Sequence, residues 1–315
     1  MNRRDVCAVL KGIAYKVGST LLFACMLALV KVYSAYPVAE LVFFRSFFAL
    51  FVLAIWLLIR GDFPRALKTS WFFGHLLRSL AGLGSMSLMF AAYGLLPLAD
   101  ATAIGYAGPL LVVVFAALLL GEKVRAPRWG AVMLGFSGVI VMLWEHLGVG
   151  GNGEAHSALG ALSAFGAAIL VSIAMIQTRR LTRTEDTGAI VFYFQSTTTV
   201  AGFLVVVLAA AWPSSWPAAA LVQSQAWVWP NAADWWPLIA VGLFGGAGQI
   251  LMTQSYRFAD ASIVACFDYS SMIWALVLGL VLFGEGPTPI AMIGAAIIAA
   301  GGLVAIFTER NVRWK

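Results

Sequence analysis

The sequence predicts an all-α membrane protein that crosses the bilayer many times. Of its 315 residues, 62% are hydrophobic and only 11% are charged, whereas soluble proteins carry about 25% charged residues. Apolar runs of about 20 residues, the length that a helix needs to cross a bilayer, recur along the whole chain. A transmembrane β-barrel would show short segments of alternating hydrophobicity instead, and the sequence has none.

Hydropathy and helix breakers divide the chain into ten expected spans. They cover residues 12–34, 38–59, 70–94, 99–120, 128–145, 157–178, 187–211, 235–256, 261–283 and 288–308. The first span resembles a signal peptide, because Arg3 and Arg4 precede its apolar part. However, Lys11 and Lys16 interrupt it, and it has a counterpart later in the chain. We therefore expect it to be retained as a helix.

Lysine and arginine occur in every second connection between these spans. In chain order, the basic segments hold Arg3, Arg4 and Lys11; Arg60, Arg65 and Lys68; Lys123, Arg125 and Arg128; Arg179, Arg180 and Arg183; Arg257; and Arg310, Arg313 and Lys315. The intervening connections hold no lysine or arginine. Because basic loops stay in the cytoplasm, both termini are predicted to be cytoplasmic. A missed or invented helix would break this alternation, which supports a count of ten.

The chain also repeats itself. The matched segments are 42–48 with 192–198, 81–94 with 244–257, 99–102 with 259–262, and 118–122 with 281–285. In this alignment Gly82 matches Gly245, and Arg45 matches Gln195. Each copy, 1–150 and 151–315, holds five spans, so the second copy must enter the membrane from the opposite side. Inverted repeats of this kind are frequent in secondary transporters, whose substrate site lies between the halves.

These patterns resemble the drug/metabolite transporter superfamily, EamA type, over essentially the whole chain. The resemblance rests on FRS at 44–46, on LPLADATAIGYAGPLLVVVFAALLLGEKV at 96–124, and on its echo around 259–285. It implies a transporter of small metabolites. Members export aromatic and other amino acids, import riboflavin or S-adenosylmethionine, or carry sugar derivatives. The second copy has CFDYSS where the first has GYAGP with Pro109, so the resemblance implies two gates that are not equivalent.

Other functional classes find little support. The net charge of +6 comes from short basic clusters between apolar runs, which is typical of membrane topology and not of nucleic-acid binding. The cysteines Cys7, Cys25 and Cys266 have no metal-ligand spacing, and we expect no cofactor. Histidines at 75, 146 and 156 are too scattered for an enzyme's catalytic set. A phosphate-binding Gly-Lys-Ser/Thr loop is also missing from the sequence, so ATP is not expected to drive this chain.

Polar side chains inside the spans are the candidates for function, because each costs about 2.5–3.5 kcal/mol to insert. The expected substrate-binding residues are His75, Arg78, Tyr106, Gln249, Asp268 and Tyr269. Arg78 and Asp268 should lie at similar depths of about 10–12 Å from the cytoplasmic face. They could pair across the halves and hold a zwitterion, or form a purely structural ion pair. The rings of Tyr106 and Tyr269 could cover an apolar substrate or face lipid.

A second set of residues is expected to act in gating or in helix packing. It consists of Arg45, Pro109, Gly82 and Gly245, and the two glycines lie on faces of small residues that favour close packing. Lys16 and Lys31 lie near opposite ends of the first span, where we expect them to reach the lipid headgroups. Six tryptophans around the seventh connection are expected to form an aromatic belt at the outer interface.

The sequence therefore predicts a secondary transporter in a bacterial inner membrane, as a monomer or weak dimer. Amino-acid export, including aromatic side chains, is the preferred hypothesis. Import or exchange of riboflavin, S-adenosylmethionine or a sugar derivative is the alternative. A passive channel is disfavoured by the inverted repeat.

Overall fold

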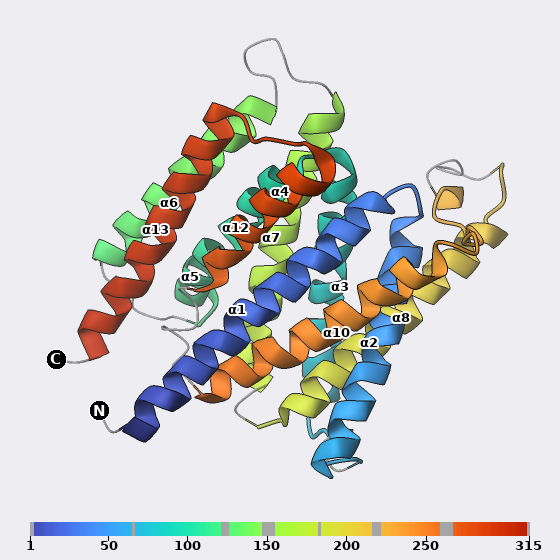
Figure 1. The fold of residues 1–315 in the computed structure, drawn as a ribbon, viewed down its shortest axis with the longest axis horizontal. Coiled ribbons are helices and arrows are strands. Elements are labelled where there is room, and N and C mark those ends of the chain that lie inside the picture. The colour runs from blue at the N-terminus through green and yellow to red at the C-terminus, as the bar shows by residue number, and fades with distance from the viewer. Residues whose placement is uncertain are drawn as a thin grey trace.

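The computed structural model describes residues 3–64, 67–120, 126–146, 155–181, 184–215, 222–258 and 267–313, and all regular elements in these ranges are helical (Figure 1). The first half contains α1 (Arg3–Val32), α2 (Val38–Arg60), α3 (Phe72–Leu95), α4 (Leu98–Gly105), α5 (Ala107–Leu120) and α6 (Ala126–His146). The second contains α7 (Ala155–Leu181), α8 (Thr187–Ala211), α10 (Trp235–Phe258), η2 (Phe267–Tyr269), α12 (Ser270–Leu278), η3 (Gly279–Phe283) and α13 (Pro289–Arg313).

The chain is a multi-pass membrane protein. Seven helical segments of the described ranges are long and apolar enough to cross a bilayer: Val9–Val32, Val38–Arg60, Phe72–Leu95, Leu98–Phe115, Ser157–Thr178, Thr187–Ala211 and Trp235–Met252. Three shorter apolar segments are Trp129–Trp144, Phe267–Phe283 and Pro289–Val304. Together they occupy the positions expected for the ten spans, while the count of ten crossings and the orientation of the termini stay predictions.

The span expected at 99–120 is broken into α4 and α5 at Tyr106. Pro109 accounts for this break, because proline has no N–H to donate to the carbonyl of Gly105, four residues earlier. Up to the break the helix stays regular, since the Tyr106 N–H donates to the carbonyls of Thr102 and Ala103. The span expected at 261–283 is irregular too, although its first residues lie outside the described part of the chain.

This second irregular segment begins with the single 3₁₀ turn η2 and ends with the π turn η3. Gly284 then adopts a left-handed conformation with φ of 65°, which glycine reaches without steric cost. The Glu285 N–H donates to the carbonyl of Gly279. This turn fixes the direction in which the Glu285 side chain leaves the end of the segment.

Helix contacts follow the pattern expected of an inverted repeat. In the repeat alignment α1 corresponds to α7, α2 to α8, α3 to α10, α4 and α5 to the η2–η3 segment, and α6 to α13. Accordingly, α1 packs on α10 as α7 packs on α3, and α1 contacts α12 as α7 contacts α4 and α5. The equivalent pairs α2–α8 and α6–α13 also pack on each other. In Figure 1, α6 and α13 form one edge of the bundle, and α2 and α8 lie toward the other.

Matched residues of the repeat meet where α2 crosses α8. Arg45 donates from Nη1 to Oε1 of Gln195, its counterpart in the alignment. Thr198 donates from Oγ1 to Oγ of Ser46 at 2.8 Å. Both bonds are buried. A contact between the matched positions 45 and 195 is what an approximate twofold axis between the two halves would produce.

The connection between α8 and α10 differs in part from the expected aromatic belt. Trp229 and Trp236 are 78% and 75% exposed, as a belt requires. The Trp227 ring instead packs on Phe44, with 5.6 Å between the ring centroids. The neighbouring Val228 N–H donates to Oε2 of Glu40 at 3.0 Å. This connection therefore covers the first turn of α2, and Trp216 lies outside the described residues.

Candidate functional site

A cavity of about 280 Å³ lies between the two halves. Its walls come from α1, α3, α4, α5, α7, η2 and α12, so both irregular segments contribute to it. The lining residues are Thr20, Phe23, Ala24, Leu27, Ser85, Met89, Tyr93, Leu98, Thr102, Gly105, Tyr106, Pro109, Ala167, Ala168, Val171, Met175, Asp268, Ser271 and Ala275. Broken helices around a central cavity are typical of transporter binding sites.

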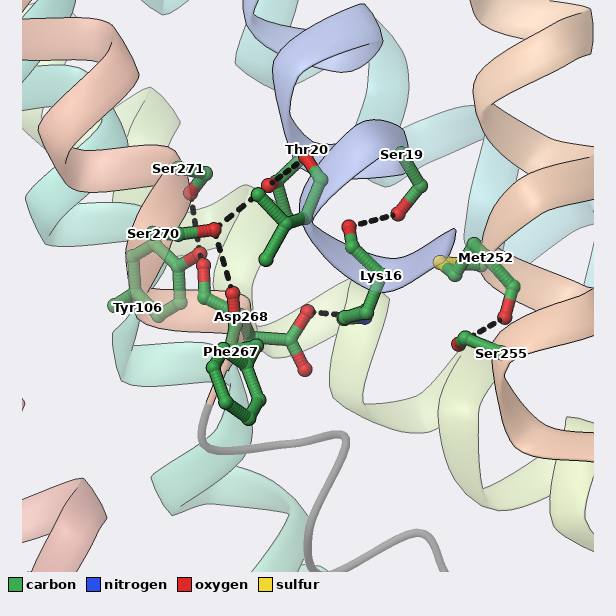
Figure 2. Close-up of polar contacts among 11 residues, drawn as sticks. Lys16, Ser19, Thr20, Tyr106, Met252, Ser255, Phe267, Asp268, Ser270 and Ser271 are labelled. Atoms are coloured by element: carbon green, nitrogen blue, oxygen red, sulfur yellow. Dashed lines mark hydrogen bonds and ion pairs between the residues drawn. The ribbon is translucent and has the colours of Figure 1, made fainter. Parts of the chain in front are cut away.

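Asp268 lies in η2 at the wall of this cavity and forms an ion pair with Lys16 of α1 (Figure 2). The Asp268 side chain is 29% exposed, whereas the Lys16 side chain is only 1% exposed. The expectation that Lys16 reaches the lipid headgroups is therefore wrong. Its ammonium instead stays inside the protein, where the carboxylate compensates for its lost hydration.

The expected pairing of Asp268 with Arg78 is also wrong. Arg78 donates from Nε to Oγ1 of Thr178 on α7, and its guanidinium lies 3.9 Å from the centre of the Phe194 ring. Arg45 approaches the same ring from α2, at 5.5 Å. Neither arginine lines the cavity. Both guanidinium groups thus belong to the α2–α3–α8 contact, where cation–π attraction to Phe194 compensates for part of their burial.

Tyr106 joins the two halves beside the ion pair. Its hydroxyl donates to the carbonyl oxygen of Asp268 and also contacts the Ser271 hydroxyl. Its ring stacks on that of Tyr269, with the centroids 4.9 Å apart. Thr20 of α1 makes a further bond to Ser270 at 2.7 Å, as Figure 2 shows. These contacts hold α1 and the α4–α5 break against η2 and the start of α12.

His75 lies apart from the cavity, although it was expected to bind substrate. Its side chain is 1% exposed, stacks on Tyr193, and lies 3.4 Å from the Glu185 carboxylate in the connection before α8. Partial burial raises the pKa of Glu185, but hydrogen bonds from Ser70, Thr69 and His75 outweigh this effect and lower it to about 2. This cluster fastens the start of α3 to the connection between α7 and α8.

The remaining expected residues fall into two groups. Pro109 lines the cavity, whereas Gln249 is buried on α10 and does not line it. Gly82 faces the Phe194 ring, where an added Cβ would approach to 2.7 Å. A Cβ on Gly245 would lie 2.9 Å from Sδ of Met26 and 3.2 Å from Nε of Arg45. Both glycines therefore allow neighbouring side chains close to the helix backbone, as packing requires.

Sequence reasoning missed a second ion pair near the other end of α1. Lys31 lies 3.1 Å from Glu285 and donates to the carbonyl of Leu96 at 2.7 Å. Its side chain is 11% exposed, so it too fails to extend freely to the headgroups. The sequence did contain a signal for both ion pairs. Lys16 and Asp268 lie near the starts of the first and ninth spans, and Lys31 and Glu285 lie near their ends.

Comparisons with known proteins agree with this arrangement. The profile described as "EamA-like transporter family" matches residues 10–144 and again 158–307. The pseudopaline exporter CntI of Pseudomonas aeruginosa is 29% identical over 302 residues, covering 95% of this chain and 97% of the relative. The S-adenosylmethionine uptake transporter of Rickettsia conorii is 25% identical over 272 residues, covering 86% and 84%.

The aromatic amino acid exporter YddG of Ancylobacter novellus is 27% identical over 225 residues, covering 70% of this chain and 71% of the relative. A protein of known crystal structure shares the fold, with a TM-score of 0.62 at 23% identity. The match covers 96% of this chain and 99% of that one.

Proposed function

Because the chain belongs to the EamA-like transporter family, we propose that it moves small metabolites across a bacterial inner membrane by alternating access. The observation that carries this proposal is the cavity of about 280 Å³ between the two halves, bounded by both irregular segments. In this proposal residues 1–150 and 151–315 form the two halves, with both termini in the cytoplasm. The lipid bilayer and a small-molecule substrate are its partners.

The size and walls of the cavity support a substrate about as large as an amino acid. Drug-sized ligands occupy pockets of roughly 300–1,000 Å³, and this cavity lies just below that range. Phe23, Met89 and Met175 supply apolar wall, while Asp268 and Tyr106 supply polar groups. Two relatives are named as exporters, which supports export, whereas the S-adenosylmethionine uptake transporter supports the alternative of import.

Flux of amino acids into liposomes containing the purified protein tests this proposal. Amino acids that raise its melting temperature should enter these liposomes faster than protein-free ones. Tyr106→Phe removes the hydroxyl bonded to Asp268 and Ser271 and is expected to reduce flux about twofold to tenfold, since one such bond contributes about 0.5–1.5 kcal/mol. Tyr33→Phe, the same change away from the cavity wall, should leave flux unchanged. Equal flux in both variants would show that the Tyr106 hydroxyl at the cavity wall does not contribute to transport.

The proposed orientation has its own test in intact cells. In a variant lacking the native cysteines, a cysteine at Ser224 should react with a reagent that cannot cross the inner membrane. A cysteine at Asp62 should not react, because its connection carries the basic residues that stay in the cytoplasm. Ser224 is solvent-exposed, and the side chain at Asp62 is 47% exposed. The reverse labelling pattern would invert the orientation of the whole chain.

A further inference from the structure

The cavity wall carries charge of one sign. Among the described residues that line it, Asp268 is the charged one, and the remaining side chains are apolar or hydroxyl-bearing. The partner of Asp268, Lys16, is 1% exposed and is not among the lining residues. In Figure 2 the dashed line from Lys16 reaches one carboxylate oxygen of Asp268. A molecule in the cavity therefore meets the carboxylate but not the ammonium.

Hydroxyl groups of the wall reinforce this preference. The Ser85 hydroxyl donates to the carbonyl of Ala167, and that of Thr102 donates to the carbonyl of Leu98. Thr20 donates in the same way to Val17, and Tyr106 donates to Asp268. A hydroxyl has one hydrogen to donate and two lone pairs. Since each hydrogen is already bonded to a backbone oxygen, these groups have only acceptor capacity left for a ligand.

An ammonium group needs acceptors, because it has three N–H donors and no lone pair. A carboxylate needs donors, but Lys16 is paired with Asp268 and does not line the cavity, and neither Arg45 nor Arg78 lines it. Arg45 bonds to Gln195, Arg78 bonds to Thr178, and both stack on Phe194. The described part of the cavity wall thus matches a cation well and offers no comparable group for an anion.

Building on the proposed transport function, we propose that this cavity selects its substrates by a cationic group that pairs with Asp268 in competition with Lys16, and that a substrate carboxylate is not required. In the absence of substrate, the Lys16 ammonium pairs with Asp268 in place of the substrate cation. A substrate cation that takes this position weakens the bond between α1 and η2. Substrate binding is in this way linked to separation of the two halves at the cavity wall.

Binding of matched triplets to the detergent-purified full chain tests this inference. Each triplet has one side chain and three charge states, for example 2-phenylethylamine, phenylalanine and 3-phenylpropionate, with further triplets built on leucine and methionine. We expect the amine and the amino acid to raise the melting temperature and the acid to have no effect. The affinity of the amine should be within about threefold of that of the amino acid, because both carry the same ammonium.

Variants of Asp268 test whether its carboxylate causes the preference for cationic ligands. In Asp268→Asn the affinity for amines should fall by about tenfold to a hundredfold, as a charge-assisted bond contributes about 1.5–3 kcal/mol. The double variant Lys16→Met with Asp268→Asn removes both charges and should show the same loss, independently of any instability of the single variant. Glu285→Gln is the matched control, since Glu285 also pairs with a lysine of α1 but does not line the cavity. It should keep the preference for cations.

The inference is overturned, with transport left intact, if the acids bind as strongly as the amines, or if amine binding is undiminished in both Asp268 variants. Binding of amino acids without binding of the matching amines would also overturn it, by showing that the carboxylate is needed. Absence of binding by every triplet counts against it as well. The transport proposal is decided separately, by flux into liposomes.

Discussion

Asp268→Asn is expected to destabilise the purified protein by about 3–5 kcal/mol. Lys16 is 1% exposed and pairs with this carboxylate, so the variant leaves an ammonium inside the protein without its counter-charge. Removing one partner of a buried ion pair typically has this cost, whereas removing both partners is often tolerated. The double variant Lys16→Met with Asp268→Asn should therefore be more stable than Asp268→Asn alone. Thermal or denaturant unfolding of the singles and the double measures this coupling.

Arg78 supplies the control for this experiment. It bonds to Thr178 and stacks on Phe194, so Arg78→Gln combined with Asp268→Asn should give additive losses of stability. Additive losses for Lys16 and Asp268, or strong coupling for Arg78 and Asp268, would contradict the pairing found in the structure.

The second large effect is expected where α6 packs on α13. A Cβ on Gly138 would lie 2.6 Å from the carbonyl oxygen of Gly294 and 2.9 Å from the backbone N of Ile298. Backbone atoms of a helix cannot move aside as a flexible side chain can, so Gly138→Leu must push the helices apart. We expect a loss of at least about 1–3 kcal/mol, the usual cost of overpacking, and a lower melting temperature.

Gly130→Leu is the matched control on the same helix, because a Cβ on Gly130 meets no atom within 4 Å. It should melt like the wild type. If both variants melted alike, close contact between α6 and α13 would contribute nothing measurable to stability.

Hydropathy located the helices well because the length of an apolar run follows directly from the thickness of the bilayer. It located their interruptions less well. Pro109 explains the α4–α5 break from local chemistry alone. The π turn at Gly279–Phe283 contains no proline, and such a turn depends on packing that a hydropathy pattern does not describe.

The residues of the candidate site were also predicted only in part. The cost of a carboxylate among apolar residues was enough to single out Asp268. Its partner was misidentified because depth was the only coordinate available, and Lys16 and Arg78 lie at similar depths in spans that enter from the same side. Which of the two faces Asp268 depends on how α1 and α3 are rotated about their axes. His75 and Gln249 were chosen for their polarity, but polarity does not distinguish a cavity wall from a buried helix contact.

If the chain arose by duplication of a five-helix unit, the bond between Arg45 and Gln195 constrains how that unit could have assembled before fusion. If two copies of the first half associated about a twofold axis, in the manner of the two halves here, Arg45 would face a second Arg45. Two buried guanidinium groups would then repel each other where a single guanidinium now donates to an amide oxygen. An assembly of two identical halves would therefore be destabilised by charge repulsion at its symmetry axis. Fusion into one polypeptide resolves the conflict, since it lets the two matched positions carry different residues.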